Sequence, residues 1–161
     1  MKAKFFAVVA LLFALAVSGF AGEFVRIDLN FWGSDAAIVP VGKLPDGVRM
    51  LKKVPFNNKK LYGFATPLIV DLGKVRSLDL KFTIQGKPGK IVPSLQSCRG
   101  DDGKFPEIEC KEFEFNGDAS TKMPMKFSKW TNSGVNAEVE DGDTVTLKAE
   151  FKTDAAAADV K

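Results

Sequence analysis

Apolar and polar residues alternate along three stretches of this chain, at residues 25–31, 78–84 and 145–151. In the middle stretch the apolar positions are Leu78, Leu80, Phe82 and Ile84. A period of two puts such side chains on one face of a β-strand. The pattern therefore predicts antiparallel sheets with one face on a core and the other toward water.

Weaker patterns predict further strands between these three. Residues 66–72 form a more continuous apolar run, which favours a strand buried on both faces, and Pro93 assigns residues 90–95 to a sheet edge. Shorter stretches complete a set of about nine or ten strands at the spacing of a sandwich or barrel. They are residues 48–54, 60–64, 111–115, 123–127 and 135–139.

These elements predict one all-β domain over residues 22–153, followed by a flexible tail at 154–161. The expected architecture is an antiparallel two-sheet β-sandwich with jelly-roll-like connectivity. An immunoglobulin-like sandwich is the alternative. No Trp lies between Cys98 and Cys110, so the Cys–Trp–Cys spacing of immunoglobulin domains is missing.

The start of the chain has the composition of a secretory signal peptide. Lys2 and Lys4 precede an apolar run of thirteen residues, 5–17, and small residues stand before a cut after Ala21. The run is too short for a transmembrane helix. We therefore expect residues 1–21 to be removed and the mature protein to be secreted or periplasmic, in a bacterial cell, with no membrane anchor.

Two cysteines remain in the exported chain, Cys98 and Cys110. An even number of cysteines in a secreted protein predicts a disulfide. The eleven residues between them are polar and rich in turn-forming residues at their start. We expect a hairpin tip closed at its base by a Cys98–Cys110 bond.

The composition excludes several classes of function. The chain has no histidine, so Ser-His-Asp and Cys-His catalytic systems are absent. Loss of Lys2 and Lys4 lowers the basic residues from 23 to 21, against 20 acidic residues. This near-neutral balance argues against nucleic-acid binding.

Carboxylates are the remaining candidates for chemistry. Glu112 and Glu114 share one face of a predicted strand, opposite Phe113 and Phe115, as a solvent-facing side does, so we assign no catalytic residue. An enzyme that acts on glycosides with carboxylates alone remains a minor alternative. Calcium is the one metal that the chain could bind, since Asp–Gly loops supply oxygen ligands. The candidate ligands, which turn formation also explains, are Asp101, Asp102, Asp141 and Asp143.

Aromatic residues near polar loops are the best candidates for a ligand-binding site. Trp130 lies in the polar segment 128–134, Trp32 precedes Gly33 at a strand end, and Tyr62 lies in a short predicted strand flanked by polar residues. Such rings can stack on sugar faces, and Asn132 can bind a hydroxyl. Each Trp also suits the end of a sandwich core, which stays the competing explanation.

The segment Val70-Asp71-Leu72-Gly73-Lys74-Val75 with the strand at 77–84 resembles part of galactose-binding-like jelly-roll domains. The resemblance covers about fifteen residues and implies ligand contacts in end loops or on one sheet face. Together these features favour a non-enzymatic secreted binding module, most simply for carbohydrate. The alternative is an extracellular adhesion or assembly subunit, in which the first strand, beginning at Phe24, pairs with a neighbour's exposed edge.

Overall fold

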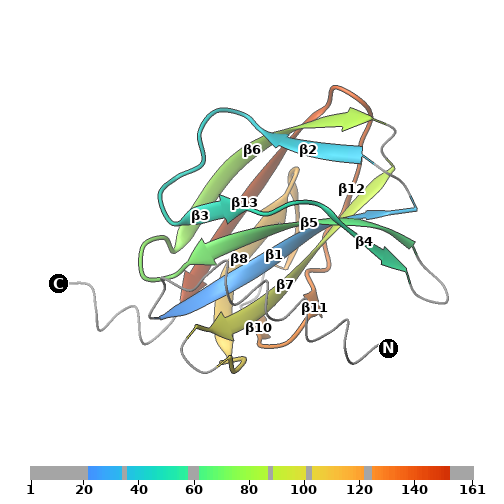
Figure 1. Cartoon of the computed structure of the whole chain (residues 1–161). Helices are drawn as coiled ribbons and strands as arrows, with labels where there is room; N and C mark the ends of the chain where they lie inside the picture. The colour runs from blue at the N-terminus through green and yellow to red at the C-terminus, as the bar shows by residue number, and fades with distance from the viewer. Residues whose placement is uncertain are drawn as a thin grey trace.

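The computed structural model describes residues 22–33, 36–57, 62–86, 89–100, 103–121 and 125–152. In this part of the chain there is no helix, and every strand pair is antiparallel. Two sheets pack face to face, which confirms the two-sheet β-sandwich (Figure 1). The predicted leader at 1–21 and the tail at 154–161 lie outside the described residues.

The larger sheet, called sheet A here, has seven strands in the order β11-β7-β1-β5-β3, with β12 also on β7 and β4 also on β5. Its long members lie in the middle and its short members at the edges. The bounds are β1 (Glu23–Trp32), β3 (Val48–Met50), β4 (Val54–Asn57), β5 (Tyr62–Asp71), β7 (Lys90–Arg99), β11 (Thr131–Asn132) and β12 (Ala137–Glu138).

Sheet B has six strands in the order β10-β8-β13-β6-β2, with β9 also on β8. Their bounds are β2 (Ala36–Pro40), β6 (Ser77–Gly86), β8 (Ile108–Phe115), β9 (Asp118–Thr121), β10 (Met125–Phe127) and β13 (Thr144–Lys152). The successive long strands β5, β6, β7 and β8 alternate between the two sheets. Residues distant in sequence therefore meet across the core.

The core lies between the sheets and follows the predicted alternation. On β6, Leu78, Leu80, Phe82 and Ile84 are at most 5% exposed, whereas Asp79 and Lys81 are exposed. The odd-numbered residues 25–31 of β1 point into the same core from sheet A. The register predicted for both strands is confirmed.

The outer faces of the two sheets differ. The outer face of sheet B is solvated: it carries Asp79, Lys148 and Glu112 in exposed positions. On the outer face of sheet A, defined by the even-numbered residues of β1 and their cross-strand partners, Phe24 and Ile69 are fully buried. The prediction that residues 66–72 are buried on both faces is confirmed. The prediction that the outer face of β1 is solvated is wrong.

The sequence predicted that Pro93 lies at a sheet edge, and this prediction is wrong. It is inside β7, opposite Leu29 of β1. The amide nitrogen and carbonyl of one strand residue point toward the same neighbour. Because Pro93 O accepts from Ser133 N at 3.1 Å, its nitrogen also faces the β11–β12 side. The pairing on that side is interrupted between Asn132 and Ala137. The N–H that proline lacks therefore removes no hydrogen bond between paired strands.

The expected disulfide is not formed. Cys98 lies on the outer face of sheet A, opposite Phe24, whereas Cys110 belongs to the core from the side of sheet B. The segment between them connects β7 in sheet A to β8 in sheet B, so it is not a hairpin tip. Sheet A therefore separates the two sulfurs.

Candidate functional site

The predicted ligand residues differ in their exposure and in the strand that holds them. Trp130 is 58% exposed and Tyr62 61% exposed, while Trp32 is half-buried. Asn132 is exposed in β11 and stands opposite Ser94 of β7. Trp130 immediately precedes β11, and its exposure agrees with the polar segment around it.

Cross-strand register brings Trp32 and Asn132 onto the outer face of sheet A. Trp32 is opposite Gly63 on β5 and Lys90 on β7, and Asn132 joins the same sheet four positions along β7, at Ser94. Four residues of a strand span about 13 Å. The sheet thus places an indole and an exposed amide at the two ends of a strip long enough for a short oligomeric ligand.

Gly63 shapes the end of this strip near Trp32. A Cβ on Gly63 would collide with the carbonyl oxygen of Phe31 and lie 2.9 Å from the Phe56 ring. Only glycine lets β1 and the Phe56 ring approach this closely. Trp32 and Phe56 therefore stand opposite Gly63 on its two neighbouring strands, with no side chain between them.

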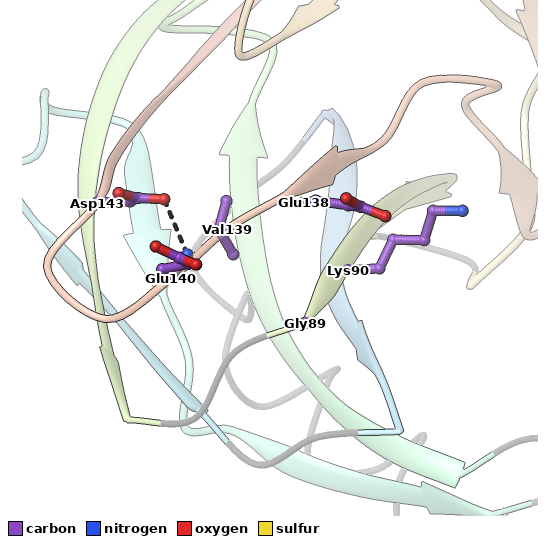
Figure 2. A pocket seen from close by; sticks show the side chains of 6 residues that line it. All are labelled: Gly89, Lys90, Glu138, Val139, Glu140 and Asp143. Atoms are coloured by element: carbon purple, nitrogen blue, oxygen red, sulfur yellow. Dashed lines mark hydrogen bonds between the residues drawn. The ribbon is translucent and has the colours of Figure 1, made fainter.

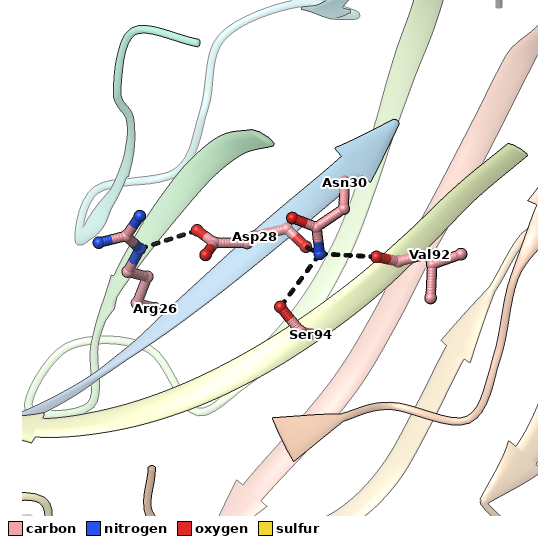
Figure 3. Close-up of polar contacts among 5 residues, drawn as sticks. All are labelled: Arg26, Asp28, Asn30, Val92 and Ser94. Carbon is pink, nitrogen blue, oxygen red and sulfur yellow. Dashed lines mark hydrogen bonds and ion pairs between the residues drawn. The ribbon is translucent and has the colours of Figure 1, made fainter. Parts of the chain in front are cut away.

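The same face carries a polar cluster that the sequence did not reveal (Figure 3), which runs along β1 from Asn30, next to Trp32 on this face, to Arg26, beyond the level of Asn132. Its members are Arg26, Asp28 and Asn30 of β1 and Ser94 of β7. Arg26 Nε donates to Asp28 Oδ1 at 2.8 Å, and both side chains are only 16% and 14% exposed. Asn30 is 7% exposed and Ser94 is 1% exposed. A polar cluster this well ordered on the outside of a sheet is the main feature of the face.

The Asn30 amide is held by three acceptors. Its Nδ2 donates to Val92 O at 2.8 Å, to Ser94 Oγ at 3.1 Å and to Asp28 O at 3.2 Å. Two of these acceptors are carbonyls, which accept only, so the nitrogen must face them. The amide orientation is therefore fixed by the strands themselves.

An open pocket of about 580 Å³ continues the face beyond Trp32, at the end of the sandwich (Figure 2). Lys90 and Glu138 stand opposite one another across β7 and β12, and their side chains lie together on one side of Val139. Glu140 and Asp143 lie on the other side, and Gly89 completes the lining. Three carboxylates and one ammonium group make this end acidic.

The calcium candidates that are described serve as turn residues. Asp141 Oδ1 accepts from Gly86 N at 3.0 Å, and Asp143 Oδ2 accepts from Glu140 N at 2.8 Å. These bonds are the usual turn chemistry of Asp. Asp101 and Asp102 lie outside the described residues. Among the residues that the structure covers, no group of three or more His, Cys, Asp or Glu side chains is arranged to hold a metal ion.

The two cysteines offer no accessible nucleophile. Cys110 is 1% exposed, and burial raises the pKa of its thiol to about 12. Its Sγ donates to Glu112 O at 3.2 Å. A protonated, enclosed thiol of this kind is chemically inert.

Comparisons with family models, with curated proteins and with solved structures give no match for this chain. Within the described ranges, no helix is long and apolar enough to cross a bilayer. The function is therefore inferred from the geometry of the outer face of sheet A.

Proposed function

We propose that this protein is a secreted, non-enzymatic binding module whose ligand, a carbohydrate, lies on the outer face of sheet A. The observation that supports this most is the ordered polar cluster of Arg26, Asp28, Asn30 and Ser94, with Trp32 beyond its Asn30 end and Asn132 beside Ser94. Ligand sites commonly combine a few fixed polar groups with apolar and aromatic surface.

Carbohydrates match both components of this face. A sugar ring presents hydroxyl groups around its edge and C–H groups on its faces. Fixed amide and carboxylate oxygens bind the hydroxyls, and an exposed indole such as Trp130 stacks on the C–H face. The resemblance of residues 70–84 to galactose-binding-like domains favours the same proposal, since those domains place ligands on a sheet face or in end loops.

The other functions expected from the sequence have less support. In sheet A, β1 pairs along its whole length with β5 on one side and with β7 on the other. It therefore has no open edge to offer a neighbouring subunit. Glu112 is exposed and Glu114 half-exposed on the solvated face of sheet B, which supports a surface role rather than a catalytic pair.

The test is a glycan array probed with the mature chain, residues 22–161, followed by calorimetry on the glycans that bind. Trp130→Ala should weaken binding by more than about 1 kcal/mol, as truncation of an aromatic anchor does. Because the ring is exposed, the same change should alter the free energy of unfolding by less than about 0.5 kcal/mol.

Phe105→Ala is the matched control, because Phe105 is also an exposed aromatic, at 42%, and lies outside the candidate site. Its affinity should equal that of the unchanged protein. The proposal fails if the array is blank, or if Trp130→Ala and Phe105→Ala bind every glycan equally well.

A further inference from the structure

We infer that the outer face of sheet A selects a neutral, hydroxyl-rich ligand through two hydrogen-bond acceptors, Asp28 Oδ2 and Asn30 Oδ1. This inference rests on the proposed function and specifies the class of ligand. It follows from the hydrogen bonds of the polar cluster (Figure 3). These bonds engage Oδ1 of Asp28 and Nδ2 of Asn30 and do not involve the other terminal atom of either side chain.

Asn30 provides the first acceptor. All three of its side-chain hydrogen bonds are made by Nδ2, and Oδ1 accepts none from the residues that the structure describes. The planar amide turns Oδ1 away from Val92 and Ser94 (Figure 3). Asn30 is only 7% exposed, so bulk water makes few hydrogen bonds with its side chain. Buried polar groups in folded proteins have a hydrogen-bond partner, and in this inference a ligand donor supplies it for Oδ1.

Asp28 provides the second acceptor, two residues along the same face of β1. Arg26 Nε binds Oδ1 at 2.8 Å, and within the described part of the chain no donor reaches Oδ2. The carboxylate is 14% exposed. Figure 3 places it on the same side of β1 as the Asn30 amide. The two oxygens therefore present two acceptors on the same face of β1 to one ligand.

Charge decides between ligand classes. The Arg26 and Asp28 charges offset one another at 2.8 Å, so the cluster has no excess charge to attract an ion. An anionic sugar would bring its carboxylate against Asp28 Oδ2 and Asn30 Oδ1, where like charge and two acceptors repel it. A hydroxyl donor satisfies both oxygens. The cluster thus suits a neutral glycan better than a uronate.

The experiment uses an array of matched oligosaccharides built from glucose, galactose and mannose, each with its uronate and amino-sugar counterparts. The mature chain should bind at least one neutral member, and its affinity should change little between low and high NaCl. Preference for a uronate or amino counterpart overturns this inference but leaves the proposed function standing. A blank array overturns both.

Variants of Asp28 test the residues themselves. Asp28→Asn keeps an oxygen for Arg26 but replaces the second acceptor with an NH₂ group, and should weaken binding about tenfold, or about 1.4 kcal/mol. Asp79→Asn is the matched control, because Asp79 is an exposed aspartate on the outer face of sheet B. Thermal unfolding checks that each variant folds, and Asp28→Ala serves if Asp28→Asn does not. Unchanged affinity in the folded Asp28 variant overturns the inference.

Discussion

Cys110 shows how burial alone sets the chemistry of one residue. Its thiol is enclosed in the core, and desolvation disfavours the thiolate, which raises the pKa from 9.0 to about 12. Backbone hydrogen bonds with Glu112 and Glu150 rank second and lower the pKa, and the negative charges of the same two residues raise it by a smaller amount. The neutral thiol therefore behaves as a small apolar side chain.

This shift predicts a pH dependence of stability. The folded pKa lies above the unfolded one, so the unfolded chain loses the proton first as pH rises. The contribution of Cys110 to the free energy of unfolding is complete below pH 9.0 and falls steadily between pH 9.0 and about 12. Urea unfolding across this range should show a steeper decline for the unchanged protein than for Cys110→Ala. Parallel curves for the two proteins would contradict the shift.

At the scale of the element, β6 is a strand whose inner and outer faces were predicted correctly from the alternation of apolar and polar residues. Phe82 is fully buried between the sheets and faces Val145 of β13 on one side and Pro40 of β2 on the other. Phe82→Ala should lower the free energy of unfolding by about 3–5 kcal/mol, because it removes apolar contacts and leaves a cavity. The measurement is equilibrium denaturation monitored by tryptophan fluorescence.

Lys81→Ala supplies the comparison for Phe82, since Lys81 is the preceding residue and points to solvent. Its effect should stay within about 0.5 kcal/mol. If both substitutions cost the same, the assignment of inner and outer faces on β6 is incorrect. A register slip of one residue would exchange the two results.

At the scale of the whole molecule, the first and the last of the described strands lie inside the two sheets and not at their edges. The first strand, β1, lies between β5 and β7, and the last strand, β13, lies between β6 and β8. A chain that stops before Thr144 loses the middle of sheet B, including Val145, Leu147 and Phe151 of the core. Each sheet therefore needs strands from distant parts of the chain before it is complete.

Truncation tests this arrangement. A chain of residues 22–143 should be unfolded by circular dichroism and by amide proton dispersion in NMR. A chain of residues 22–152 keeps every described strand and should fold like the chain of residues 22–161. A cooperative thermal transition in the shorter chain would show that β13 is not essential to sheet B.

The remaining edges of the sandwich are short. The strands at or beside the edges, β2, β3, β4, β9, β10, β11 and β12, have two to five residues each. Short edges limit pairing between molecules. The arrangement therefore favours a module that presents a face rather than a strand to its partner.

The sequence by itself determined the fold class, the register of β1, β6 and β13, and the double burial of β5, because side-chain alternation is a local property of each strand. The exposure of Trp130 was also readable from its polar neighbours. The five-residue β2 was missed, since a strand so short carries too little alternation to recognise.

Only the tertiary structure decided the rest, because it depends on which distant segments become neighbours. The sequence placed Cys98 and Cys110 in one hairpin, but the crossing from sheet A to sheet B separates them. Pro93 is accommodated inside β7 by a gap in the strand beside it. Asn30 and Ser94, 64 residues apart, become a buried polar pair only when β1 and β7 align, and no local pattern encodes that pairing.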